Sequence, residues 1–207
     1  MRNYTIIGVT GPTGAGKSTI TNYFKQKGCY IIDADLLGKQ AMEKGSLCLK
    51  QAGAVFGKDI LNSDGTLNRQ VLAKKAFSTA ENTGLLNSIT HPWICMQTIK
   101  RADEIRNSAE NPVIVFDAAV LLESHMDIIC DYVLAVVAPL QVRKSRIMKR
   151  DNLTEENANI RIKAQQQDLF YTTAADFVID GSGQLEDIHS SVDNILAKIT
   201  GGGLDYC

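Results

Sequence analysis

The stretch Gly11-Pro12-Thr13-Gly14-Ala15-Gly16-Lys17-Ser18 is a complete match to the pattern G-x-x-x-x-G-K-[ST]. It follows the apolar run 4–9 and precedes a helical pattern over 18–26, so it joins a strand to a helix. Glycines let such a loop curl its backbone N–H groups inward, and the following helix adds the positive end of its dipole. The stretch therefore predicts a loop that binds phosphate groups.

Four more apolar runs rich in β-branched residues predict strands at 29–32, 112–116, 132–137 and 177–179. Their nearly continuous hydrophobicity is typical of parallel strands covered on both faces, and helical patterns separate them. The sequence therefore predicts an α/β fold of the P-loop NTPase type, with three layers and a five-stranded parallel sheet.

A single domain over 1–207 is expected, with a nucleotide-binding core formed by 1–35, 111–139 and 171–200. Between the second and third strands, 36–110 is predicted to be a helical insertion that forms a wall for a second substrate. One of its helices is expected to open at Thr90-His91-Pro92, because proline suits the first helical position. Asp64-Gly65 indicates a turn, for which a link between helices is favoured over a hairpin.

The composition excludes several classes of protein. The 207 residues are 44% hydrophobic and 22% charged with a net charge of -1, which favours neither nucleic acid nor an anionic membrane as a partner. No apolar run approaches the roughly 20 residues that a membrane-spanning helix needs, so a cytoplasmic protein is expected. The five cysteines are far apart and predict buried reduced thiols plus a thiol in the tail, Cys207, rather than a zinc site or disulfides.

The phosphate loop suggests roles for individual residues in binding ATP. Lys17 is expected to reach the β- and γ-phosphates, and the Ser18 hydroxyl to ligate Mg²⁺. Asp117 follows the strand 112–116, where P-loop enzymes place the acid that holds Mg²⁺, although an aspartate there is equally common as a turn residue. The predicted ATP-binding residues are Gly11, Thr13, Gly14, Ala15, Gly16, Lys17, Ser18, Thr19, Arg146 and Arg150.

Two acids follow the strand 29–32. Asp33 and Asp35 come at its carboxyl end, which is the edge where parallel sheets bind ligands. If extension continues, both side chains point the same way, so at least one should face the phosphates. Asp33 leaves the strand first and is the predicted acceptor of a proton from an attacking hydroxyl; Asp35 has an equal claim to be a helix cap.

A basic cluster lies in the segment 140–170. Arg143, Arg146 and Arg150 are spaced i, i+3, i+7 and are expected to share one helix face. A solvated charged face is the simple explanation, but beside a phosphate loop such arginines close over ATP and stabilise charge in the transition state. The segment is predicted to be a helical lid. Its second helix should begin at the cap Thr154 and carry Arg161 with Gln165, Gln166 and Gln167.

Shorter motifs accompany the phosphate loop in a fixed order. They are 7–11, 32–35, 56–57, 64–69, His91-Pro92, 121–123, Arg146 with Arg150-Asp151, Arg161-Ile162 with Ala164-Gln165, and 176–180. With these motifs the chain resembles the dephospho-CoA kinase family over nearly its whole length. Many families share the phosphate loop, whereas Asp33-Ala34-Asp35, the His-Pro pair and the Arg-Ile-x-x-Gln segment are specific in combination.

The resemblance implies ATP-dependent phosphorylation of the 3′-hydroxyl of dephospho-CoA, the last step of coenzyme A biosynthesis. It implies ATP and dephospho-CoA as partners, Mg²⁺ as cofactor, Asp33 as base with Lys17 and Arg146 as further catalytic residues, and a CoA-binding role for the helical insertion. Arg69, His91 and Arg161 become candidates for substrate contacts, although a histidine before proline is more often found shaping a helix start. The oligomeric state stays open.

Several positions depart from the usual family pattern. Pro12-Thr13 stands for Gly-Ile, Ala119 for proline, Lys39 for arginine or histidine, and Gly181 for asparagine. Lys39 keeps the charge without the planar fork of arginine. A nucleoside or nucleotide kinase of the same fold and a non-catalytic CoA-binding paralogue therefore stay as alternatives. A GTPase-like switch is disfavoured, because the chain has no Asn-Lys-x-Asp motif.

Overall fold

The computed structural model describes residues 3–201, so the predicted tail thiol Cys207 lies outside the described residues. The strands are β1 Thr5–Thr10, β2 Tyr30–Asp33, β3 Val113–Asp117, β4 Tyr132–Val137 and β5 Phe177–Asp180. The helices are α1 Lys17–Gln26, α2 Ala34–Ala41, α3 Leu47–Phe56, α4 Arg69–Ala76, α5 Ala80–Arg106, α6 Leu140–Asp151, α7 Glu155–Lys163, α8 Asp168–Ala174 and α9 Leu185–Ile199, with 3₁₀ turns η1 Lys58–Ile60 and η2 Met126–Ile129.

The five strands form one sheet in the order β2-β3-β1-β4-β5, and the pairs β1–β3, β1–β4 and β4–β5 are parallel. Each strand lies within one residue of its predicted bounds, so the predicted α/β fold with a five-stranded sheet is confirmed. Successive side chains of a strand face opposite sides of the sheet. Both sides are buried here, as the burial of Ile6, Ile7 and Val9 in β1 illustrates.

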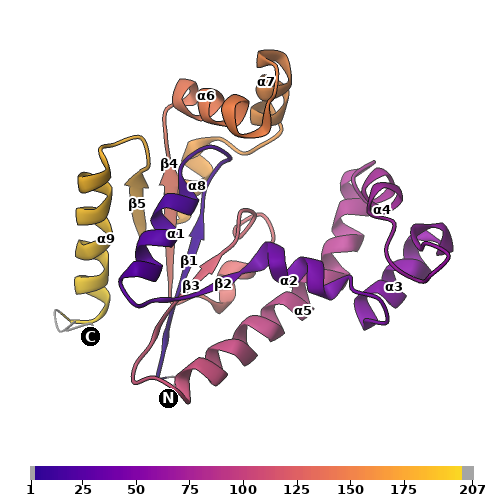
Figure 1. Cartoon of the computed structure of the whole chain (residues 1–207), viewed down its shortest axis with the longest axis horizontal. Helices are drawn as coiled ribbons and strands as arrows, with labels where there is room; N and C mark the ends of the chain where they lie inside the picture. Colours follow the sequence, from indigo (N-terminus) through magenta and orange to yellow (C-terminus); the bar gives the residue numbers. More distant parts are fainter. Residues whose placement is uncertain (1–2, 202–207) are drawn as a thin grey trace. The chain divides into compact units, whose positions relative to one another are not determined.

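One face of the sheet is covered by α1 and α9, which pack against each other (Figure 1). Apolar residues of both helices, such as Phe24 and Val192, join the strand residues in one buried cluster. α8 packs against β4, and its Tyr171 is fully buried. Helices on the sheet therefore make the core on which the phosphate loop is mounted.

The chain divides into two compact units: Asp33–Asp103 is the first, and the described residues on either side of it form the second, called the core unit below. The first of these has its own apolar core, made by α3, α4, η1 and their surroundings, with Leu49, Ile60 and Leu72 among its buried residues. The Asp64-Gly65 turn follows η1 and leads to α4. The predicted link between helices is therefore confirmed at this turn, which also closes a single isolated antiparallel bridge between Leu61 and Leu67.

The prediction that a helix opens at Pro92 was wrong. α5 runs unbroken over Ala80–Arg106, with Pro92 inside it. The helix starts where the Thr79 hydroxyl accepts a hydrogen bond from the Asn82 N–H, at 3.1 Å. The stripe Thr90, Ile94, Thr98 and Ala102 is buried at every fourth position, and this burial outweighs the loss of one N–H donor at the proline. In the part of the chain that the structure describes, neither α5 nor another helix has the length and apolarity to cross a membrane.

Candidate active site

The phosphate loop leaves β1 and enters α1, as predicted. Gly11, Gly14 and Gly16 all have positive φ, a conformation that side chains with a Cβ disfavour. Gly11 shows the reason most clearly, because a Cβ there would lie 2.0 Å from the carbonyl oxygen of Val136 in β4. Gly16 caps α1 without a side chain, so the first N–H groups of the helix have no capping side chain at this end.

Lys17 and Ser18 are the first two residues of α1. Lys17 Nζ donates to the Gly11 carbonyl at 2.9 Å, so the lysine side chain reaches back across the loop to its first residue. Ser18 and Thr19 are exposed at the start of the helix. The structure therefore brings the predicted phosphate-binding residues together at the amino end of α1, where the helix dipole favours anions.

Arg146, on α6, holds the outside of this loop. Its Nη1 donates to the carbonyl oxygens of Gly14 and Ala15 at 3.3 and 3.2 Å, and its Nη2 donates to the Gly181 carbonyl at 2.8 Å. The arginine thus joins three segments, namely α6, the phosphate loop and the turn after β5. Gly181 takes part through its backbone carbonyl.

Arg143 lies on the same face of α6 and is 4% exposed. Its Nε donates to the Thr13 carbonyl at 3.2 Å, and its Nη1 forms an ion pair with Asp168 at 2.8 Å. Because a buried guanidinium is costly unless its donors are paired, these two partners fix the side chain in place. The alternative of a solvated charged face is therefore wrong for Arg143.

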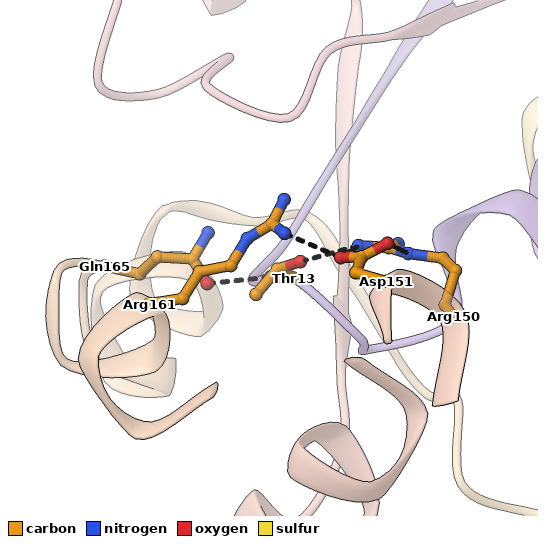
Figure 2. A network of polar contacts seen from close by, with 5 residues as sticks. All are labelled: Thr13, Arg150, Asp151, Arg161 and Gln165. Atoms are coloured by element: carbon orange, nitrogen blue, oxygen red, sulfur yellow. Dashed lines mark hydrogen bonds and ion pairs between the residues drawn. The ribbon is translucent and has the colours of Figure 1, made fainter. Parts of the chain in front are cut away.

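Arg150 lies one helical turn after Arg146 on α6 and completes the predicted face. Its Nη2 lies 3.5 Å from the Thr13 hydroxyl, and its guanidinium also pairs with Asp151. From α7, Arg161 reaches the same carboxylate, and Gln165 Oε1 accepts a hydrogen bond from the Thr13 N–H at 2.9 Å (Figure 2). Arginines 143, 146 and 150 thus all touch the loop, as their spacing predicts.

α7 begins at the predicted cap, since the Thr154 hydroxyl accepts a hydrogen bond from the Asn157 N–H. It ends at Lys163, so the prediction that Gln165, Gln166 and Gln167 belong to this helix was wrong. The Gln165 side chain is instead directed to the loop, and Gln167 is the cap of α8. The hydrophobic periodicity of a helix does not mark its last residue in the sequence. Here the end of α7 coincides with the contact of Gln165 with the loop.

The two predicted Mg²⁺ ligands lie in the core unit. Asp117 is the last residue of β3, paired in register with Val9 of β1, two residues before the phosphate loop. Among residues 3–201, no group of three or more histidine, cysteine or acidic side chains could hold a metal by itself. A hydroxyl and a carboxylate are hard oxygen donors of the kind that Mg²⁺ prefers, and Mg²⁺ commonly completes its shell with phosphate oxygens and water. The donor set therefore fits the ion.

Asp33 is the last residue of β2 and the N-cap of α2, because its Oδ1 accepts from the Leu36 N–H at 3.0 Å. Asp35 lies in the first turn of α2. The cap, one of the two predicted roles of Asp35, is therefore wrong, and the condition of continued extension is not met, because the backbone turns helical directly after Asp33. Both carboxylates are exposed.

The candidates for substrate contacts come from two different units. Arg69 is the exposed first residue of α4, after the cap Asn68, whereas Arg161 belongs to the core unit. His91 lies within α5, so the prediction that it shapes a helix start was wrong. The unit Asp33–Asp103 has a hollow of about 630 Å³, and neither Arg69 nor His91 lines it; its walls are Val55, Phe56, Asp59, Val71, Lys74, Lys75, Ser78 and Asn82.

Sequence reasoning missed several partners of the site. Asp168 pairs with Arg143, Gln165 meets the loop, and Asp151 joins two arginines. A further pair involves α8, where the hydroxyl of the buried Tyr171 donates to Glu123 at 2.7 Å. The adjacency of Arg150 and Asp151 was a usable signal for one of these partners. The others are separated in sequence by 25 or more residues; Gln165 and Glu123 belong to motifs of the family resemblance, but nothing in the sequence pairs them with Thr13 or Tyr171.

A parallel sheet with a phosphate loop after β1, and a helical segment whose arginines reach that loop, define a P-loop kinase. The model of the family CoaE, dephospho-CoA kinase, matches residues 5–187. The dephospho-CoA kinase of Corynebacterium glutamicum is 38% identical over 193 residues, covering 93% of this chain and 96% of the relative. That of Listeria innocua is 38% identical and covers 90% and 92%. The chain therefore belongs to the dephospho-CoA kinase family, and it is a kinase.

Solved structures share the fold of this chain. TT1252 from Thermus thermophilus has a TM-score of 0.79 at 29% identity, covering 96% of this chain and 99% of that one. Dephospho-CoA kinase from Campylobacter jejuni has a TM-score of 0.58 at 21% identity, with 95% and 98% covered. Shikimate kinase from Acinetobacter baumannii, at 0.54 and 15% with 99% and 97% covered, shares the fold.

Proposed function

We propose that this chain transfers the γ-phosphoryl group of ATP to the 3′-hydroxyl of dephospho-CoA, which gives coenzyme A and ADP. Membership of the family supports the reaction. The observation that carries the site is the phosphate loop gripped by Arg143, Arg146 and Arg150 from one face of α6. The acceptor hydroxyl attacks the γ-phosphorus in line with the departing ADP oxygen, so the chemistry depends chiefly on positioning and on charge stabilisation.

The core unit binds the nucleotide in this proposal. The N–H groups of the loop and of the start of α1 hold the phosphates, and Lys17 neutralises charge on the β- and γ-phosphates. Arg146 and Arg150 stabilise the charge that spreads over the equatorial oxygens in the transition state. Ser18 and Asp117 hold Mg²⁺, which screens the phosphate charge when it is bound.

Asp33 takes the proton of the 3′-hydroxyl as that oxygen attacks. Its position at the end of β2 supports this role, because parallel sheets bind their ligands at the carboxyl ends of strands. The unit Asp33–Asp103 binds the CoA moiety, with Arg69 and His91 as contacts and Arg161 as a further contact from the lid. The segment 140–170 closes over ATP as a lid, and a cytoplasmic location stays a prediction.

The test is ADP release by the purified chain with Mg²⁺-ATP, comparing dephospho-CoA with adenosine, AMP and other nucleosides, with mass spectrometry of each product. Phosphate added to dephospho-CoA alone is the expected result. Turnover with a nucleoside or nucleotide alone would favour the related kinase function, and no turnover would favour a binding paralogue.

Lys17→Ala supplies the matched variant for this assay. Since Lys17 is proposed to contact the phosphates, its loss should weaken ATP binding and turnover together. Normal kinetics in this variant would refute the assignment of the phosphate site, whichever acceptor is used.

A further inference from the structure

The carboxylate of Asp151 pairs with two arginines that lie on different helices. Its Oδ1 accepts from Arg150 Nε at 2.8 Å, and its Oδ2 accepts from Arg150 Nη2 at 2.8 Å and from Arg161 Nη1 at 2.6 Å. Arg150 lies beside it on α6, whereas Arg161 projects from α7 (Figure 2). One carboxylate therefore fixes the guanidinium groups of both arginines.

The ion pairs with Asp151 leave N–H donors of both arginines available. Each guanidinium has five N–H donors, and the bonds to Asp151 occupy one edge of each group. The side chains of Arg150 and Arg161 are 57% and 49% exposed, so the other edges remain accessible. Two cations around one anion also leave the cluster with a net positive charge. The cluster is thus able to receive a second, more highly charged anion.

This cluster is also attached to the phosphate loop. The Thr13 hydroxyl lies 3.5 Å from Arg150 Nη2, and the Thr13 N–H donates to Gln165, four residues after Arg161. Both ends of the segment that contains the arginines therefore contact one loop residue (Figure 2). An anion held by the loop would lie within the reach of guanidinium groups that are already oriented.

We propose that Asp151 is a positioning residue for phosphoryl transfer, which holds Arg150 and Arg161 so that their remaining N–H groups meet the phosphates of bound ATP. The inference rests on the proposed kinase function. An unrestrained arginine loses side-chain freedom when it grips a phosphate, and one that is already held loses less. Its hydrogen bonds with Arg150 keep the pKa of Asp151 below the usual range, so the carboxylate stays charged at neutral pH.

The test compares Asp151→Asn with a control on the same pair of helices. Glu155→Gln is matched, because Glu155 on α7 pairs with Lys144 on α6 at 2.6 Å and so joins the two helices without touching either of these arginines. The readouts are kcat, KM for each substrate, the affinity for ATP without acceptor by calorimetric titration, and the thermal midpoint.

We expect Asp151→Asn to lower kcat by roughly 10- to 100-fold and to weaken ATP binding, since misplaced phosphate-binding groups lose charge stabilisation. The thermal midpoint should stay near the wild-type value, and Asp151→Glu, which keeps the charge, should recover part of the loss. Glu155→Gln should match wild type throughout.

Three results would overturn the inference. An equal loss of kcat and of ATP affinity in Asp151→Asn and Glu155→Gln would show that Asp151 only connects the two helices. Unchanged kinetics would deny it any role, and tighter ATP binding would make it a competitor for the arginines. If wild type fails to phosphorylate dephospho-CoA, the proposed function fails, and the ATP titration of the two variants still decides the role of Asp151.

Discussion

Gly181→Ala tests how closely the turn after β5 supports the phosphate loop. A Cβ at Gly181 would lie 2.0 Å from the carbonyl oxygen of Ala15, whereas real Cβ atoms essentially never approach within 3.0 Å, so the two segments must separate by about 1 Å. The turn itself resists movement, because the Gly181 N–H donates to Val137 at 2.8 Å and Asp180 accepts from both the N–H and the hydroxyl of Ser182. The strain therefore falls on the loop.

Overpacking of this kind costs about 1–3 kcal/mol of unfolding free energy, which corresponds to roughly 2–12 °C in the melting midpoint of a chain of this size. Displacement of the loop by about 1 Å should also lower kcat/KM for ATP by up to roughly 100-fold. Calorimetry and steady-state ADP release measure the two effects.

Gly53→Ala is the control for this prediction. Gly53 lies inside α3, and a Cβ there meets nothing within 4 Å, so alanine should be neutral or stabilise by about 0.5–1 kcal/mol. If Gly181→Ala melted and turned over like wild type, the close support of the loop by this turn would be refuted.

Three further predictions concern single residues. Asp33→Asn should lower turnover by roughly 10²-fold or more with ATP affinity nearly intact, because asparagine caps a helix as well as aspartate and only the base is lost; an unchanged rate would remove Asp33 from that role. Pro92→Ala should raise the unfolding free energy by up to about 3 kcal/mol in a urea titration, since it restores an N–H donor inside α5, and a loss of stability would contradict this. Burial raises the pKa of the Cys29 thiol to about 12, so iodoacetamide at pH 8 should leave Cys29 intact in the native protein and modify it in urea; rapid native labelling would show the thiol to be accessible.

The strands and the phosphate loop could be predicted from sequence because each depends on local chemistry. Buried parallel strands must be apolar throughout, and a loop that curls its backbone favours glycine where φ is positive, as at Gly14 and Gly16. The common face of Arg143, Arg146 and Arg150 follows from helical periodicity alone. These features need no knowledge of what lies across the fold.

Other features depend on contacts between distant segments. The place of Pro92 inside α5 depends on a buried stripe that outweighs the proline, and the burial of Arg143 depends on Asp168, 25 residues away. The same holds for Asp33 and Asp35, where only the abrupt start of α2 decides which carboxylate caps the helix. At each of these positions the local sequence is compatible with both alternatives: proline starting or lying inside a helix, arginine exposed or buried, and either aspartate as the cap.

The grip of Arg146 on the loop has an electronic consequence. The carbonyls of Gly14 and Ala15 that accept its hydrogen bonds belong to planar trans peptides, so the N–H groups of Ala15 and Gly16 point the opposite way. Hydrogen bonds in series polarise one another, so the guanidinium makes the amides on the far side of these peptides stronger donors. The Ala15 N–H already donates to the Pro12 carbonyl at 3.2 Å, so a change in α6 that broke these bonds would weaken the attraction of the loop for an anion chiefly at the Gly16 N–H.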